Sequence, residues 1–167
     1  MKVNGTKIEY VVVQSKDNNY YLTNNFEKKS NSAGWIFSDY RNKLDGTDKN
    51  IIIYGHNMRT KAMFGTLENA LTKEWQENKE NRHIVFATEN EYSIYEVFSV
   101  YQIEAEDYYM TTDFKNNEFK EFVNTIKNRS VFDFEVDVDE NDKILTLSTC
   151  ANNSKYRIVL HAKHELE

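Results

Sequence analysis

The chain has 167 residues, enough for one domain with a sizeable buried core. Hydrophobic residues make up 40% of it, with 11 Tyr and 10 Phe, which excludes an intrinsically disordered protein. The formal net charge of −6 argues against general nucleic-acid binding, and no apolar run reaches the roughly 18 residues that a membrane span needs.

Short β-rich runs separated by polar turns dominate the chain. Each run is bounded by polar residues, and several are rich in β-branched and aromatic side chains, as strands usually are. About eight such runs at fairly regular spacing predict a mainly β protein, either a closed barrel or a sandwich. The predicted strands, in chain order, are residues 6–14, 20–22, 35–37, 50–54, 83–88, 92–103, 144–149 and 156–162.

Two segments break the β pattern. Residues 61–71 predict a short helix that buries Met63, Phe64 and Leu67. Residues 113–129 predict a longer helix, because four apolar side chains recur there at helical spacing. The longer helix lies within a long connection between two strands, and long connections in compact domains are often functional.

The only cysteine, Cys150, ends a predicted strand and has no disulfide partner within the chain. Arg157 begins the return strand after a turn at 151–156, so an antiparallel hairpin places both residues at the same end of the sheet. His56 lies just past the strand 50–54, after a glycine that permits a sharp turn. These three side chains are therefore predicted to meet on one rim.

A thiol, an imidazole and a guanidinium on one rim suit acyl transfer. A thiolate attacks a carbonyl, an imidazolium protonates the leaving amine, and a guanidinium donates hydrogen bonds to the substrate or the developing oxyanion. A neighbouring cation also increases the thiolate fraction of a cysteine. A cysteine hydrolase that uses water, and a binding barrel with an inert buried cysteine, remain alternatives.

The residues around these groups resemble the sortases, the cysteine transpeptidases of Gram-positive surfaces. Thr-Leu-Ser-Thr-Cys at 146–150 is similar to the sortase TLxTC signature, and Arg157 lies where the sortase arginine is expected. The residues at 53–58 and 63–64 resemble the segment around the sortase histidine. The resemblance is strongest to class B and covers nearly the whole chain. Its other class B features lie at residues 4–6, 12–14, 20–22, 36–42 and 113–129.

The resemblance implies a closed eight-stranded sortase β-barrel with a helix in a long connection and short peripheral helices. It also implies a transpeptidase that cleaves a cell-wall sorting signal after its threonine. Cys150 would carry the thioacyl intermediate, His56 would act as general acid and then base, and Arg157 would position and polarise the substrate. An amine of peptidoglycan or its lipid-linked precursor, or a pilin lysine, would resolve the intermediate.

Four substrate-binding residues also come from this resemblance. Tyr109 and Met110 resemble the class B pair that packs against the proline of the sorting signal, and Ser148 resembles the residue near the end of the signal. Asn57 follows the histidine in the matching segment and completes the predicted set. No cofactor, metal or nucleic acid is expected.

Plainer interpretations exist for several residues. His83 opens a predicted strand and is interpreted as structural. His161 and His164 lack the further ligands of a tight metal site, so no metal is assigned to them. Arg157 alone would be an ordinary surface ion-pair residue. The connection 151–156 carries no acid, so a carboxylate role after the cysteine is not carried over from the family.

We therefore expect one sortase catalytic domain over residues 1–167, with 166–167 interpreted as vector residues. The first residues are polar and offer no signal peptide. The predicted location is the extracellular face of the membrane of a Gram-positive bacterium, through an N-terminal anchor absent from this chain.

Overall fold

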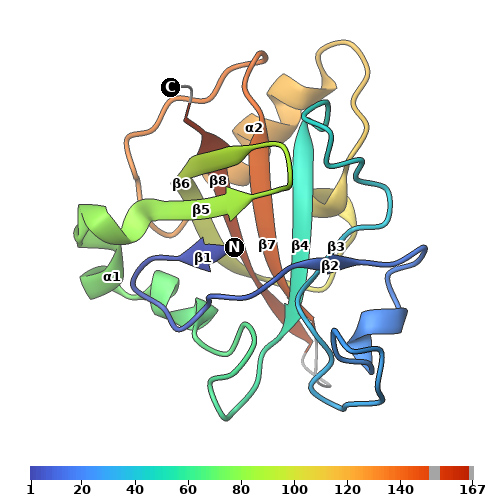
Figure 1. Cartoon of the computed structure of the whole chain (residues 1–167). Helices are drawn as coiled ribbons and strands as arrows, with labels where there is room; N and C mark the ends of the chain where they lie inside the picture. The colour runs from blue at the N-terminus through green and yellow to red at the C-terminus, as the bar shows by residue number, and fades with distance from the viewer. Residues whose placement is uncertain (151–154, 166–167) are drawn as a thin grey trace.

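A computed structural model describes residues 1–150 and 155–165, and for Cys150 the backbone alone. The described residues form one eight-stranded sheet in the order β1-β5-β6-β8-β7-β4-β3-β2. The sheet is strongly curled, and helices and loops lie around its outside (Figure 1). The predicted mainly β, eight-stranded fold is confirmed. The strands are β1 (Lys2–Val3), β2 (Val13–Gln14), β3 (Phe37–Ser38), β4 (Asn50–His56), β5 (His83–Ala87), β6 (Tyr92–Glu104), β7 (Ile144–Cys150) and β8 (Tyr156–His164).

The N-terminal segment joins the two ends of the sheet. Gly5, at φ 69°, lies in a reverse turn that brings residues 8–10 back along β1. The Val3 amide donates to the Ile8 carbonyl at 2.9 Å, and two backbone hydrogen bonds between Met1 and Tyr10 continue this contact. The chain then runs directly into β2. Residues 4–12 therefore connect β1 and β2, the strands at the two ends of the sheet.

The interior of the curled sheet is a continuous apolar core. Ile53 of β4, Val97 of β6, Leu147 of β7 and Leu160 of β8 are completely inaccessible to solvent. These strands are buried because β-branched and aliphatic side chains fill the pleated inner face.

The long helix covers the β6 side of the sheet. The helix α2 (Glu118–Asn128) buries the apolar face that the spacing predicted, and Ser99 of β6 donates to the Ile126 carbonyl at 2.6 Å. It begins at Glu118, five residues later than predicted, because Asn116 adopts φ 49° and interrupts the helical backbone. The remaining helical segments are α1 (Lys73–Glu77) and the 3-10 turns η1 (Tyr20–Leu22), η2 (Leu67–Leu71), η3 (Lys79–Arg82) and η4 (Tyr108–Met110).

The predicted strand at 20–22 is wrong, because this segment forms the 3-10 turn η1. The Asp17 carboxylate accepts hydrogen bonds from the backbone amides of Asn19 and Tyr20, both at 2.9 Å. Such a local side-chain acceptor favours a turn over an extended strand. In Figure 1, η1 (blue) lies beside the lower end of β4.

Two further boundaries differ from the prediction. Only Val13–Gln14 of the predicted strand 6–14 joins the sheet at β2, because the preceding residues return along β1. Only Leu67–Leu71 of the predicted helix 61–71 is helical, because Lys61 and Met63 adopt φ values of 66° and 53°. The predicted burial of Met63, Phe64 and Leu67 is confirmed.

The pairing of the strands places the chemistry. β4 and β7 are parallel neighbours, so their C-terminal ends reach the same edge of the sheet. In their register His56 is the partner of Cys150. β8 returns antiparallel to β7, with Ser148 opposite Val159. Ser148 and Val159 are the last described pair of that register, and Cys150 and Arg157 each lie two residues beyond it, towards the same end of the sheet. The turn predicted at 151–156 falls mostly outside the described residues.

Candidate active site

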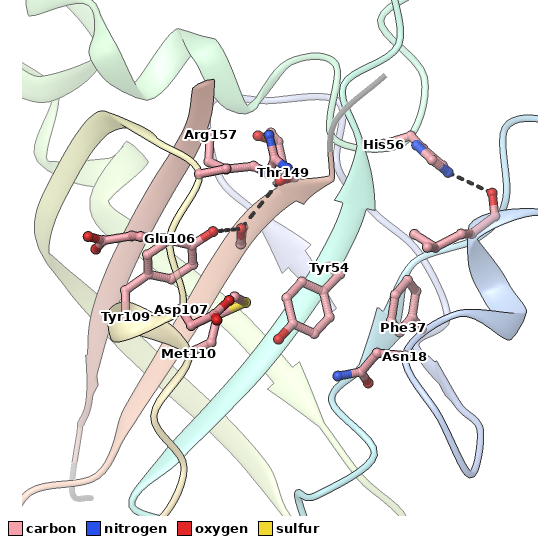
Figure 2. Close-up of a pocket in the computed structure, with 13 residues that line it drawn as sticks. Asn18, Phe37, Tyr54, His56, Glu106, Asp107, Tyr109, Met110, Thr149 and Arg157 are labelled. Carbon is pink, nitrogen blue, oxygen red and sulfur yellow. Dashed lines mark hydrogen bonds between the residues drawn. The ribbon is translucent and has the colours of Figure 1, made fainter. Parts of the chain in front are cut away.

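A cavity of about 550 Å³ opens at the C-terminal ends of β4 and β7 (Figure 2). Its walls come from the η1 turn, from β3 and β4, from the loop after β6 and from β7 and β8. It brings together five of the seven residues predicted from the sequence. The described residues that line it are Asn18, Leu22, Phe37, Tyr54, His56, Ala105, Glu106, Asp107, Tyr109, Met110, Ser148, Thr149 and Arg157.

His56 is the last residue of β4 rather than a residue just beyond it. Its side chain is buried, and its Nε2 lies 2.7 Å from the Leu22 carbonyl oxygen. A carbonyl only accepts, so Nε2 must carry a proton. Its Nδ1 is buried and has no hydrogen-bond partner among the described residues. The neutral ring therefore keeps Nδ1 as its unprotonated nitrogen.

The backbone around His56 is tightly held. A Cβ atom at Gly55 would lie 2.5 Å from Ile36 Cδ1 and 2.7 Å from Phe64 Cγ, so only glycine fits here. The His56 carbonyl then accepts from the Phe64 amide at 2.9 Å. The chain reverses immediately after the histidine, and this turn fixes where β4 ends.

Arg157 lines the opposite side of the cavity. It lies on β8, where it pairs with Ile103 of β6, and its side chain is half-buried. Its Nη1 donates to the Tyr156 carbonyl at 3.1 Å. In Figure 2 Thr149 lies between Arg157 and His56. The hydrogen-bonded nitrogen of His56 points away from Thr149 and Arg157. The cavity thus has a histidine on one wall and a guanidinium on the other.

The predicted substrate-binding residues divide into two groups. The Tyr109 hydroxyl lies 2.9 Å from Ser148 Oγ, so the η4 turn is bonded directly to β7, and Met110 lines the cavity beside them. Asn57 is exposed, pairs with Met63 in an isolated bridge and is not among the described lining residues. The peptide-binding roles of all four residues stay predictions, because geometry alone does not test them.

Comparison with known families decides which kind of protein this is. A family model described as the sortase domain matches residues 1–165. The chain belongs to the sortase family.

Its relatives are class B sortases. The chain is 40% identical over 164 residues to sortase B of Listeria monocytogenes, covering 95% of this chain and 65% of that protein. It is 37% identical over 169 residues to sortase B of Staphylococcus aureus, covering 98% of this chain and 68% of that protein. This sortase therefore spans about two thirds of the length of the curated relatives it matches. The family and class predicted from the sequence are confirmed.

Solved structures agree with this fold. The Clostridium perfringens sortase B structure superposes with a TM-score of 0.90 at 38% identity, covering 99% of this chain and 91% of that one. A Staphylococcus aureus sortase B–substrate complex superposes with a TM-score of 0.92 at 36% identity, covering 98% of this chain and 77% of that one. In the described part of this sortase, no helix has the length and apolar character needed to cross a membrane.

Several lining residues of this sortase were not predicted from the sequence. Asn18 and Leu22 were missed because the 20–22 segment was interpreted as a strand. The acceptor Asp17, two residues before Asn19, was the available signal for a turn. Tyr54 was missed because it lies inside a strand whose apolar run hides which face each side chain takes.

His161 is unavailable as a metal ligand. It is completely buried, with Nδ1 2.8 Å from Thr146 Oγ1 and Nε2 2.9 Å from the Tyr101 hydroxyl. Burial, and then the charge of Arg129, lower the pKa of His161 to about 3. Both nitrogens are used inside the barrel, so the histidine is neutral and structural.

Proposed function

We propose that this chain is the catalytic domain of a class B sortase-type cysteine transpeptidase. Its substrate would be the sorting signal of a secreted surface protein, cleaved after threonine. The acceptor would be an amine of peptidoglycan or its lipid-linked precursor. The site of action would be the extracellular face of the membrane of a Gram-positive bacterium, as proposed from the sequence.

One observation carries this proposal: the strand register pairs His56 with Cys150, and His56 lines the same cavity as Arg157. A nucleophile, a base and a cation at one cavity form the minimum set for thiol-based acyl transfer. Related structures support the two substrates, because sortase B of Staphylococcus aureus was solved with a substrate and a sortase B was solved with triglycine.

The proposed reaction has two halves. The Cys150 thiolate attacks the threonine carbonyl carbon, and the C–N bond to the next residue breaks as protonated His56 gives a proton to the leaving amine. The acyl group is then held as a thioester on Cys150. A second amine attacks that thioester, gives up its proton to His56, and the C–S bond breaks to restore the thiolate.

The roles of individual groups follow from their hydrogen bonds. We assign proton transfer to Nδ1 of His56, because Nε2 is engaged by the Leu22 carbonyl. Arg157 would position the substrate and stabilise the developing oxyanion through its guanidinium. Tyr109, Met110 and Ser148 would contact the peptide. Asn57, which is not among the described lining residues, is retained as a proposed substrate contact.

The decisive experiment is mass spectrometry after incubating the protein with short peptides of the form x-Pro-x-Thr-x. The reactions are run with and without triglycine or diaminopimelate. We expect a thioacyl adduct on Cys150 and a joined product when amine is present. Cys150→Ala should retain the fold by circular dichroism and lose both species.

Other results would change the proposal. Cleavage at the same rate without any joined product, with every amine offered, would favour a cysteine hydrolase. A folded protein that forms no adduct with any peptide, and whose thiol resists a small alkylating reagent, would favour a binding barrel without activity.

A further inference from the structure

A buried carboxylate stands behind the cavity wall. Asp39 follows β3 and its side chain is completely inaccessible to solvent. Five hydrogen bonds end on it. Its Oδ1 accepts from the backbone amide and the Nε of Arg41, both at 2.9 Å. Its Oδ2 accepts from Arg41 Nη2 and the Tyr54 hydroxyl at 2.8 Å, and from Asn18 Nδ2 at 3.0 Å.

Each donor leads to a different wall of the cavity. Asn18 belongs to the segment before η1, and Tyr54 belongs to β4. Arg41 Nη2 also donates to the Met110 carbonyl at 2.9 Å, which ties the η4 turn to the same carboxylate. Figure 2 shows Asn18, Tyr54 and Met110 around the lower part of the cavity, although they come from distant parts of the chain. Asp39 itself does not line it.

The charge of Asp39 is retained in this environment. Burial opposes ionisation, but the hydrogen bonds from Arg41, followed by the one from Tyr54, more than offset it and hold the pKa of Asp39 below its usual range. Burial, followed by the charge of Asp39, raises the pKa of Tyr54. The tyrosine hydroxyl is therefore a permanent donor to the carboxylate, and its orientation in the cavity wall is set.

We propose that Asp39 is a positioning residue that determines peptide specificity, because one carboxylate fixes the Tyr54 hydroxyl, the Asn18 amide and, through Arg41, the Met110 backbone. A bidentate arginine–carboxylate pair holds both partners in one plane, which a single hydrogen bond does not. The segment before η1 and the η4 turn are thereby held at one separation. The claim about specificity rests on the proposed transpeptidase function; the claim about positioning does not.

The test compares Asp39→Asn and Arg41→Lys with the wild-type protein. Arg41→Lys is expected to fold, because it keeps the positive charge at a partly exposed position. It loses the planar guanidinium, which alone can bond both carboxylate oxygens of Asp39 side by side. For a cleaved x-Pro-x-Thr-x peptide, KM should rise about tenfold in both variants with kcat changed less than about threefold, the pattern of lost ground-state binding. The ratio of kcat/KM values between peptides that differ at positions other than the threonine should move towards one in both variants.

A second readout needs no activity. Hydrogen exchange followed by mass spectrometry should show faster exchange over residues 105–111 in both variants, while β6 to β8 remain protected. Asp142→Asn is the matched control: Asp142 is also a largely buried carboxylate, paired with Lys163 at 3.0 Å, but it precedes β7 at the end opposite the cavity. Asp142→Asn should lower the unfolding free energy, while KM and the amide exchange rates of residues 105–111 should stay at their wild-type values.

The outcomes separate the two proposals. Unchanged exchange at 105–111 in both variants would overturn the positioning role, as would KM values equal to those of Asp142→Asn. A wild-type protein that cleaves no peptide would count against the proposed function, and the exchange result would still decide the role of Asp39.

Discussion

His56 and His161 are both buried in this sortase, yet their surroundings differ in one respect. His161 lies within β8 and both of its nitrogens are hydrogen bonded. Thr146 Oγ1 donates to Asn50 Oδ1 at 2.6 Å, so towards His161 it must accept, which places the ring proton on Nδ1. His56 lies at the end of β4 and has one nitrogen bonded to Leu22, with Nδ1 unpartnered among the described residues.

The difference teaches how burial acts on a titratable ring. A buried ring whose two nitrogens are bonded by neutral partners takes a second proton only at a high cost, because the partner that donates to it must turn round and the new charge is buried without a counter-ion. A buried ring at a cavity with one nitrogen left over can exchange that proton with a substrate. Burial alone therefore does not distinguish a structural histidine from a catalytic one, but the count of satisfied nitrogens does.

The largest expected effect comes from His56→Gln. Glutamine can still bond the Leu22 carbonyl but cannot transfer a proton, so kcat should fall by about 10²–10⁴-fold. The change in unfolding free energy should stay small, because the amide can replace the hydrogen bond to Leu22, which is the one that the ring makes among the described residues. Peptide cleavage under saturating substrate, together with urea denaturation, measures both.

A matched histidine controls for that result. His83 opens β5, lies 3.7 Å from the Glu165 carboxylate and has a side chain 34% exposed. His83→Gln should leave kcat unchanged and alter the unfolding free energy by less than about 0.5 kcal/mol. Equal loss of activity in both variants would remove the distinction drawn for His56.

The next effect is on stability. His161→Phe leaves Thr146 Oγ1 and the Tyr101 hydroxyl without their shared partner inside the barrel, which should lower the unfolding free energy by about 2–4 kcal/mol. The turnover of the folded protein should stay within about tenfold of wild type, since His161 does not line the cavity. If His161→Phe were as stable as wild type but inactive, His161 would take part in catalysis and would not be a structural residue.

The smallest effect is a pH dependence of stability. The pKa of His161 is about 3 in the folded state and about 6.5 in a model peptide, so the unfolded chain binds the proton more readily. Stability is then fully present above about pH 6.5 and is lost progressively as the pH falls towards about 3. As the pH falls from about 7 to about 5, protonation of this residue in the unfolded chain should lower the unfolding free energy by about 2 kcal/mol.

Urea denaturation at both pH values measures that change. In His161→Phe the difference in unfolding free energy between the two pH values should be smaller by a similar amount, because the variant has no imidazole to protonate at this position. An identical pH dependence in the variant and the wild-type protein would contradict the assignment. Asp39 does not enter this comparison, since its lowered pKa affects stability only at more acidic pH.

Much of the fold was predictable because its long strands carry strong local patterns. β4, β5, β6, β7 and β8 were all found, and the hairpins β5–β6 and β7–β8 follow from short polar connections. Short elements were less predictable. η1 was mistaken for a strand because three consecutive apolar residues do not reveal the Asp17 acceptor that bends the chain. The start of α2 was displaced by a single left-handed residue, Asn116.

By itself the sequence determined the family and the three groups proposed for chemistry, because Cys150, His56 and Arg157 lie within local motifs that can be read along the chain. Only the tertiary structure decided what surrounds them. Parallel pairing of β4 with β7 sets His56 level with Cys150, which no local pattern encodes. The hydrogen bonds around Asp39 join three segments that are far apart in the chain, and contacts of that kind exist only after the sheet has curled.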